Sequence, residues 1–282
     1  MAKTVAQAIA DLTARFAAVD SGSARLDARV LTAHALGRDT DQLFSRAELP
    51  LPPGAEAALE GFAARRLAFE PVSRIIGRRE FWSMDFVLTR DTLDPRPDTE
   101  TLVAAVLAVR EAYPAPRLLD LGTGTGCILL AILKDWPTGT GIGVDLNPGA
   151  VNVAADNAQR LGLASRAAFH VGNWCAGLGE KFDLIVTNPP YIADGELENL
   201  APGMTRFDPR VALSGGRDGL AAFRALLPEA HRYLRENGRI FLEIGAGQAE
   251  TVSGLLAASG FRPTGEHADL AGFVRCLEAV PA

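Results

Sequence analysis

The spacing of apolar residues predicts a helical segment at the start of the chain. Apolar residues recur at three- and four-residue intervals, as on one buried helix face, at Val5, Ile9, Leu12 and Phe16. The pattern returns over residues 25–36 and, after the proline-containing break at 49–54, over residues 55–67. We therefore predict a helical domain over residues 1–70. A purely structural bundle would show the same pattern, and we assign the domain to substrate recognition.

After residue 70, apolar residues recur at the shorter, two-residue spacing that is typical of strands. Residues 72–77 and 80–88 alternate like two short strands, and a turn is expected at residues 77–79. We predict a β-hairpin over residues 71–93 that links two domains. A helix follows, because the stretch 94–100 holds a proline and acidic residues that suit a first helical turn.

From residue 117 onward, strand-like and helix-like segments alternate, which is typical of a mostly parallel sheet with helices on both faces. Expected strands cover residues 117–121, 141–146, 167–171, 182–188, 239–244, 261–265 and 272–277. Expected helices cover residues 127–134, 149–161, 219–234 and 248–258. We predict an α/β fold with a seven-stranded, doubly wound, Rossmann-like sheet in a domain spanning residues 94–282.

Composition narrows the function classes. The chain of 282 residues carries a net charge of −6, from 28 basic and 34 acidic residues, which disfavours a broad nucleic-acid-binding face. Its three cysteines lie far apart and predict neither a disulfide framework nor a zinc site. No apolar run is long enough to span a membrane, and no secretory segment follows the first residues. We expect a cytoplasmic protein without membrane contact.

A glycine-rich turn follows the first sheet strand and opens the next helix. Its three glycines let the backbone bend sharply and let an anionic ligand approach the helix start without side-chain clashes. Position 127 is cysteine, so the spacing departs from the dinucleotide fingerprint. The stretch instead resembles motif I of class I S-adenosylmethionine (AdoMet) methyltransferases, although a structural turn would also use such residues. The expected cofactor-binding residues are Gly122, Thr123, Gly124, Thr125 and Gly126.

Two further residues suit a nucleotide-type cofactor. Asp145 ends the second sheet strand, where a carboxylate accepts hydrogen bonds from both hydroxyls of a ribose. An N-cap role is the alternative, but Asn147 fits that role better. Trp174 follows the third strand and either flanks an adenine ring or is simply a half-buried aromatic residue. We assign Asp145 and Trp174 to cofactor binding.

The tetrapeptide Asn188-Pro189-Pro190-Tyr191 follows the fourth strand. Two prolines cannot continue a central strand, so the chain turns out of the sheet at the edge where open α/β sheets bind ligands. The tetrapeptide resembles the motif of methyltransferases that act on planar nitrogens. A strand-ending turn without a further function is the alternative.

The chemistry of a planar nitrogen explains these residue types. Its lone pair is delocalised, so it is a poor nucleophile. Acceptors from the Asn188 side chain and the Pro189 carbonyl would hold the NH₂ group in line with the methyl donor. Tyr191 would stack on the planar substrate group. We assign catalysis to Asn188, Pro189 and Tyr191, substrate binding to these three and Pro190, and a cofactor contact to Asn188.

Together the motifs resemble the protein-(glutamine-N5) methyltransferases that modify peptide-chain release factors, a class I methyltransferase family. The matching stretches are residues 79–82, 95–100, 120–126, 188–191, 209–213 and 215–220. The resemblance implies methyl transfer from AdoMet to the side-chain amide N5 of the glutamine in the release factor's Gly-Gly-Gln motif, and hence a role in translation termination. The N-terminal helices would help to grip the release factor.

Two positions depart from the family pattern. The family often has an acidic residue where Gly203 stands and glutamate where Asp208 stands. Both lie outside the catalytic turn, so we expect them to affect partner contacts more than chemistry. We also hypothesise that residues 96–100 lie over the cofactor pocket, so that Glu100→Ala weakens AdoMet binding or turnover.

Other functions stay open at this point. An adenine-N6 methyltransferase acting on RNA or DNA uses a similar tetrapeptide and fold, but the acidic balance argues against it. A nicotinamide-dependent oxidoreductase is disfavoured by the glycine spacing and by the prolines after the fourth strand. A non-catalytic binding module is disfavoured by the intact Asp145 and Asn188. We expect a monomer that meets nucleic acid only indirectly.

Overall fold

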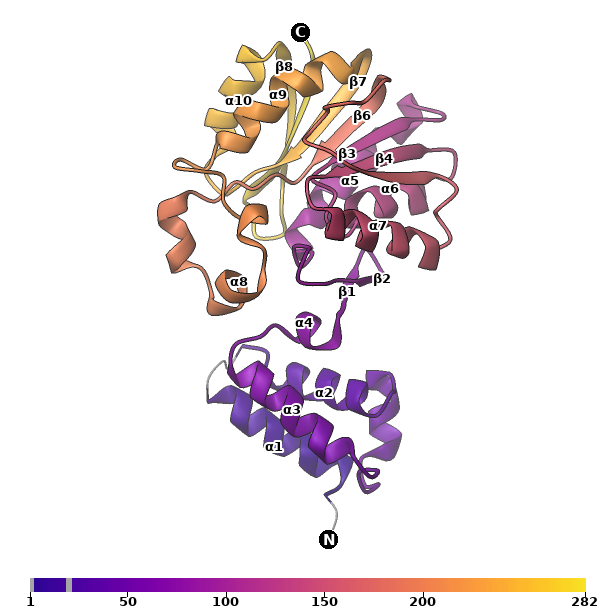
Figure 1. Ribbon diagram of the computed structural model, residues 1–282, viewed down its shortest axis with the longest axis vertical. Coiled ribbons are helices and arrows are strands. Elements are labelled where there is room, and N and C mark those ends of the chain that lie inside the picture. The colour runs from indigo at the N-terminus through magenta and orange to yellow at the C-terminus, as the bar shows by residue number, and fades with distance from the viewer. Residues whose placement is uncertain (1–2, 19–21) are drawn as a thin grey trace. The chain divides into compact units, whose positions relative to one another are not determined.

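The computed structural model describes residues 3–18 and 22–282. It forms two compact units (Figure 1). The helical unit comprises Met1–Gly77 and Ala201–Phe207, and the sheet unit comprises Arg78–Leu200 and Asp208–Ala282. Each unit has its own apolar core.

The helical unit packs its helices around leucine and phenylalanine side chains. Its elements are α1 (Val5–Ala17), α2 (Ala24–Ala35), η1 (Thr40–Arg46, a 3₁₀ helix), α3 (Ala55–Leu67), α4 (Val72–Ile76) and α8 (Pro202–Phe207). Leu12 and Phe16 of α1 are buried with Leu31 of α2, as the apolar spacing predicts. Arg66 and Asp27 form a buried ion pair at 2.7 Å that ties α3 to α2.

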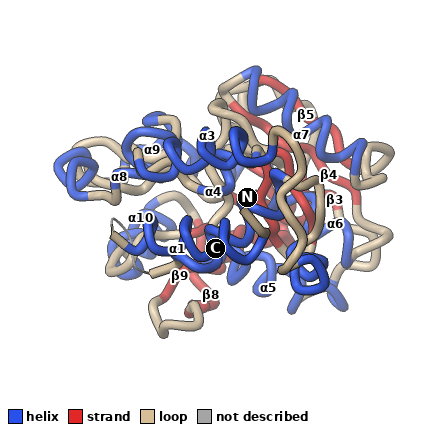
Figure 2. Tube along the Cα trace, turned by 90° about the horizontal axis from the view of Figure 1, so that it is seen from below, coloured by secondary structure: helices blue, strands red, loops and turns tan. Residues whose placement is uncertain are grey.

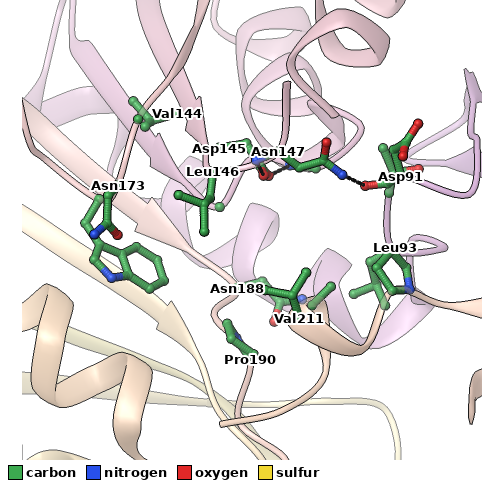
Figure 3. Close-up of a pocket in the computed structure, with 17 residues that line it drawn as sticks. Asp91, Leu93, Val144, Asp145, Leu146, Asn147, Asn173, Asn188, Pro190 and Val211 are labelled. Atoms are coloured by element: carbon green, nitrogen blue, oxygen red, sulfur yellow. Dashed lines mark hydrogen bonds between the residues drawn. The ribbon is translucent and has the colours of Figure 1, made fainter. Parts of the chain in front are cut away.

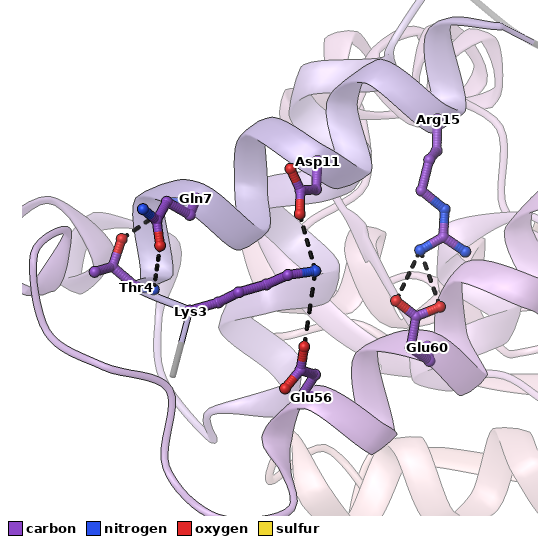
Figure 4. Close-up of polar contacts among 7 residues, drawn as sticks. All are labelled: Lys3, Thr4, Gln7, Asp11, Arg15, Glu56 and Glu60. Carbon is purple, nitrogen blue, oxygen red and sulfur yellow. Dashed lines mark hydrogen bonds and ion pairs between the residues drawn. The ribbon is translucent and has the colours of Figure 1, made fainter. Parts of the chain in front are cut away.

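Polar contacts fix the start of α1 and join it to α3 (Figure 4). The Thr4 hydroxyl accepts from the Gln7 backbone N–H at 3.3 Å, and the Gln7 side chain accepts from the Thr4 N–H at 3.0 Å. Arg15 of α1 pairs with Glu60 of α3 at 2.9 Å on the surface. Such surface pairs contribute at most about 1 kcal/mol, so the apolar core dominates the stability of this unit.

The linking hairpin is present, but its strands lie later than the sequence predicts. The first predicted strand is instead helix α4, which Gly77 ends with a φ of 71°. Strands β1 (Arg78–Phe81) and β2 (Met84–Val87) pair around a turn at Trp82 and Ser83. Both turn residues have positive φ, as a two-residue hairpin turn demands. The predicted turn at Gly77 is wrong because that glycine caps a helix, whereas the actual turn contains no glycine.

The sheet unit, all of it described, holds a seven-stranded sheet in the order β5-β4-β3-β6-β7-β9-β8 (Figure 1). Figure 2 shows strands in red and helices in blue. Its strands are β3 (Arg117–Leu121), β4 (Thr140–Asp145), β5 (Ala167–Val171), β6 (Phe182–Thr187), β7 (Leu234–Glu243), β8 (Phe261–Ala268) and β9 (Val274–Pro281). Pairing is parallel from β5 to β7, and β9 is antiparallel to β7 and β8. The predicted seven-stranded, doubly wound fold is confirmed.

Helices cover both faces of this sheet. The first face carries α5 (Glu100–Ala108), α6 (Cys127–Asp135) and α7 (Pro148–Arg160), and the second carries α9 (Ala221–Tyr233) and α10 (Ala249–Ala258). Short 3₁₀ helices are η2 (Pro97–Thr99), η3 (Arg110–Ala112), η4 (Asp194–Asn199) and η5 (Arg210–Ala212). Leu184 and Val186 of β6 join the first core, whereas Ile185 joins the second. Alternate residues of this central strand are therefore buried on opposite faces.

The order of the strands brings the sequence motifs to one edge. Leu121 at the end of β3 is paired with Val144 of β4 on one side and with Thr187 of β6 on the other. The glycine turn, Asp145 and Asn188 therefore leave the sheet at the same edge, because β3 is adjacent to both β4 and β6. No helix among residues 3–18 and 22–282 is both long and apolar enough to cross a membrane.

A buried asparagine joins the hairpin to this edge. Asn157 of α7 accepts a hydrogen bond from the Val87 N–H at 2.9 Å and donates to the Val87 carbonyl at 3.0 Å. It also donates to the carbonyl of Thr125, within the glycine turn, at 3.0 Å. Because buried polar groups are costly to leave unpaired, these bonds fix β2 against the turn.

Candidate active site

A cavity of about 400 Å³ opens at the carboxyl edge of the parallel strands, entirely within the sheet unit (Figure 3). That volume lies within the usual range of roughly 300–1,000 Å³ for small-molecule sites. Asn188 and Pro190 lie across the cavity from Asp145 and Asn147. The predicted site residues that line it are Gly122, Gly124, Asp145, Trp174, Asn188 and Pro190.

The glycines of the turn have two different roles. All three have positive φ, which disfavours any residue with a side chain. Gly122 and Gly124 line the cavity, so their backbone is open to a ligand. Gly126 faces inward, where an added Cβ would lie 3.2 Å from side-chain atoms of Ala154 and Leu130. Gly126 therefore permits close packing beneath the turn rather than contact from within the cavity.

The two threonines of the turn also lie outside the cavity lining. Thr123 and Thr125 are buried, and the Thr123 hydroxyl donates to Asp120 at 2.6 Å. Burial raises the pKa of Asp120 to about 7, although the hydrogen bond from Thr123 lowers it. Thr123, Thr125 and Asp120 therefore stabilise the turn on its buried side.

Asp145 is fixed by two backbone donors. Its Oδ2 accepts from the Gly124 N–H and its Oδ1 accepts from the Asn147 N–H, each at 2.9 Å. The N-cap of α7 is Asn147, whose side chain accepts from the Gly149 N–H at 2.8 Å, as the sequence predicts. Because a carboxylate has about four acceptor positions, Asp145 retains capacity for two ribose hydroxyls.

Trp174 forms a wall of the cavity beside the glycine turn. Its ring atom Cζ3 would lie 4.0 Å from a Cβ built on Gly122. Its φ is 51°, an unusual backbone conformation for a bulky residue. Strain of this kind persists where the surrounding structure imposes it, and it is frequent at ligand sites.

Two residues of the tetrapeptide line the cavity and two do not. Asn188 and Pro190 line the cavity, whereas Pro189 is buried and Tyr191 lies outside the lining. The Asn188 Nδ2 donates to the Thr99 hydroxyl at 3.2 Å, which leaves its Oδ1 as the acceptor for a ligand. The Tyr191 hydroxyl donates to Glu243 at 3.3 Å, and burial raises the pKa of this phenol. Tyr191 is thus a neutral, anchored residue.

A second loop supports the tetrapeptide from behind. The Gln248 side chain donates to the Tyr191 carbonyl at 3.0 Å, and the Gly215 N–H donates to the Ile192 carbonyl at 2.8 Å. Gly219, with a φ of 75°, approaches the Tyr191 carbonyl so closely that a Cβ there would overlap it. Sequence reasoning matched residues 215–220 to a family but gave them no role. The structure shows that they brace the turn.

The segment 96–100 does not lie over the cavity as hypothesised. Glu100 is not among the lining residues, and its carboxylate accepts from the Trp82 N–H in the hairpin turn at 2.8 Å. The lining residues from this part of the chain are Asp91, Thr92 and Leu93. Thr99 nevertheless reaches Asn188, a contact that sequence spacing could not reveal.

The structure shows what surrounds Asp208 and Gly203, the two positions that depart from the family pattern. Asp208 is buried and pairs with Arg96 at 2.5 Å. Gly203 lies in α8, where an added Cβ would be 3.1 Å from the Phe69 carbonyl. The Asp208 carboxylate is therefore enclosed and holds the loop that follows the hairpin, and its effect on partner contacts stays a prediction.

Two family models and several relatives match this chain. Residues 7–77 match the PrmC N-terminal domain, and residues 114–256 match a methyltransferase domain. The chain is 46% identical to the release factor glutamine methyltransferase of Cereibacter sphaeroides over 97% of both chains. It is 50% identical to the enzyme of the same name from Rhodospirillum rubrum over 90% of this chain and 78% of that one.

The chain belongs to the release factor glutamine methyltransferase family. A solved structure, the hMettl16 catalytic domain in complex with an RNA hairpin, aligns with a TM-score of 0.56. It is 16% identical and the alignment covers 71% of this chain and 76% of that one, so it supports the fold alone. The class I methyltransferase fold predicted from the sequence is confirmed.

The cofactor of this methyltransferase is AdoMet, and the cavity suits it. Gly122 and Gly124 present backbone without side chains, so a ligand can approach the start of α6 closely. Asp145 offers acceptors for ribose hydroxyls, and Trp174 offers an aromatic surface. Among the described residues, no cluster of His, Cys, Asp and Glu could hold a metal ion.

The raised pKa of Asp120 predicts a pH dependence of stability. The carboxyl ionises near its ordinary value of 3.8 when unfolded and at about 7 when folded, so the free energy of unfolding falls as pH rises between these values. Asparagine does not ionise, so Asp120→Asn removes this decrease in the free energy of unfolding. The decrease is on the order of 3 kcal/mol, since each pKa unit corresponds to about 1.4 kcal/mol. The melting temperature should therefore depend less on pH in the variant between pH 4 and 7.

The matched control is Asp156→Asn, on the exposed face of α7. It should keep the wild-type slope of melting temperature against pH. A wild-type slope in Asp120→Asn as well would contradict the buried, proton-binding state of Asp120.

Proposed function

We propose that this chain transfers the methyl group of AdoMet to the side-chain amide nitrogen of the glutamine in the Gly-Gly-Gln motif of peptide-chain release factors. The observation that carries the proposal is the orientation of Asn188. Its NH₂ group is bound by Thr99, so its carbonyl oxygen is left to accept a hydrogen bond from a substrate NH₂. This acceptor lies across the cavity from Asp145.

The proposed chemistry needs positioning more than a base. Bound AdoMet supplies an electrophilic methyl group. Asn188 Oδ1 and the Pro189 carbonyl each accept one N–H of the substrate amide, which holds the nitrogen in line and favours the pyramidal geometry of the transition state. The Tyr191 phenol stays protonated, because burial raises its pKa. The amide N–H becomes acidic as the methyl group is transferred, so no strong base is required.

The relatives also weigh against the other enzyme functions. Those that match nearly the whole chain are named release factor glutamine methyltransferases, which favours this substrate over an adenine base or a nicotinamide-linked substrate. We propose that the helical unit, whose residues 7–77 match the PrmC N-terminal domain, helps to hold the release factor. We further propose that the enzyme acts as a monomer in the cytoplasm, where translation terminates, and meets nucleic acid only through its substrate.

The direct test is methyl transfer from labelled AdoMet to purified release factor. Wild-type release factor should be labelled, and a release factor whose tip glutamine is replaced should not. Equal labelling of both proteins would show that the assigned substrate is wrong.

In the enzyme, Asn188→Ala should lower kcat roughly 100-fold or more, because it removes an interaction that is strongest in the transition state.

The control for this variant is Asn199→Ala, an exposed asparagine in η4. Asn199→Ala should keep the wild-type kcat, and AdoMet affinity should change little in either variant. A wild-type kcat in Asn188→Ala would contradict the mechanism, as would a loss confined to AdoMet binding.

The bracing of the tetrapeptide gives a second test. Gly219→Ala and Gly247→Ala both place a side chain at positive φ, which costs on the order of 1 kcal/mol of stability. Only at position 219 would the new Cβ overlap the Tyr191 carbonyl, since nothing lies within 4 Å of a Cβ at position 247. Gly219→Ala should therefore lose most of its methyl transfer activity, and Gly247→Ala should retain it. Equal activities would show that the brace does not position the tetrapeptide.

A further inference from the structure

Glu243 is a buried carboxylate with no role in the chemistry described so far. It ends β7 and is only 2% exposed. Leu242 is paired with Thr187 of β6, so Glu243 lies one position further along, beside Asn188. It does not line the cavity. A buried carboxyl is costly unless it is hydrogen-bonded, so its neighbours indicate what it does.

Those neighbours are the residues that hold the proposed substrate acceptor. The Tyr191 hydroxyl donates to Glu243 Oε1 at 3.3 Å. Burial raises the pKa of Glu243 to about 7, and the neighbouring hydroxyls of Thr99 and Tyr191 lower it. Thr99 in turn accepts from the Asn188 Nδ2 at 3.2 Å. Glu243 thus binds Tyr191 of the tetrapeptide directly, and Thr99, which binds Asn188, is its neighbour.

We propose that Glu243 is a positioning residue, which sets the orientation of the Asn188 amide through Thr99 and anchors Tyr191 at the same time. The inference rests on the proposed function, since it concerns the acceptor for the substrate glutamine. Glu243 does not line the cavity, so it acts only through these two hydroxyls.

The direction of the hydrogen bonds carries the argument. Asn188 donates to Thr99, so the Thr99 hydroxyl proton must point to another acceptor. Glu243 Oε2 accepts no hydrogen bond from any residue that the structure describes, so it is the acceptor with capacity for that proton. In its ionised form the Glu243 carboxylate only accepts, and in that form it enforces a chain that runs from Asn188 through Thr99 to Glu243.

A glutamine at position 243 would allow the opposite direction. Its NH₂ group can donate to Thr99, whose hydroxyl can then donate to the Asn188 carbonyl. The Asn188 amide would turn over and present its NH₂ group to the substrate NH₂. Two donors cannot form a hydrogen bond, so the substrate nitrogen would lose its acceptor while the AdoMet side of the cavity stayed unchanged.

The test compares Glu243→Gln, Thr99→Val and the double variant, with Glu250→Gln on the exposed start of α10 as the matched control. The measurements are kcat with wild-type release factor, the dissociation constant of AdoMet, and the melting temperature. Each single variant should lose about tenfold or more in kcat and change AdoMet affinity by less than about twofold. The double variant should lose no more than the worse single variant, because both act through one chain of hydrogen bonds.

The possible results separate the inference from the proposed function. If wild-type enzyme labels wild-type release factor but Glu243→Gln keeps the kcat of Glu250→Gln, the inference alone is overturned. Multiplicative losses in the double variant also overturn it, since independent structural damage would produce them. If Glu243→Gln does not fold, Thr99→Val decides, and a wild-type kcat in that variant rejects the link. Absence of labelling by the wild-type enzyme overturns the proposed function and the inference with it.

Discussion

The parallel pairing of β3 with β6 is the constraint on which the rest of the structure depends. Leu121 and Thr187 are register partners, so the glycine turn and the tetrapeptide begin at neighbouring positions. Each turn suits one reactant. The glycine turn offers backbone without side chains, beside Asp145, for the cofactor, and the tetrapeptide offers Asn188 on a stiff backbone for a planar amide. Methyl transfer needs both reactants aligned, and alignment alone can supply several kcal/mol of the barrier reduction. The sheet therefore provides the geometry, and the turns provide the chemistry.

Buried polar groups make this edge rigid. Asp120 lies beneath the glycine turn and Glu243 lies beneath the tetrapeptide, and burial raises the pKa of both carboxyls to about 7. Asn157 joins the glycine turn to the hairpin. Polar groups in an apolar interior must keep their partners, so each of them restricts the conformations available to the residues above it. Burying these groups costs stability, and the order that they impose suits a site that positions its substrate rather than one that uses a strong base.

Local sequence patterns predict the sheet well and its contacts poorly. The strands from Arg117 to Thr187 are found within one residue of their bounds, because buried parallel strands form short apolar runs between turn residues. The hairpin is misplaced because its turn at Trp82 and Ser83 contains no glycine. Motifs identify some of the residues that line the cavity, but not Asp91, Thr92 or Leu93, which reach it from the loop after the hairpin. Thr99 is 89 positions from Asn188 in the sequence, so that contact depends on how the elements pack, which no local pattern encodes.

The central claim is that Asn188 accepts a hydrogen bond from the substrate glutamine while the glycine turn holds the methyl donor. A crystal structure of the enzyme with S-adenosylhomocysteine and wild-type release factor tests it most directly. The predicted result is a glutamine side-chain nitrogen about 2.7–3.2 Å from Asn188 Oδ1, with the ribose of the bound product against Asp145. A glutamine amide bound by other residues, with Asn188 turned toward the cofactor alone, would contradict the account.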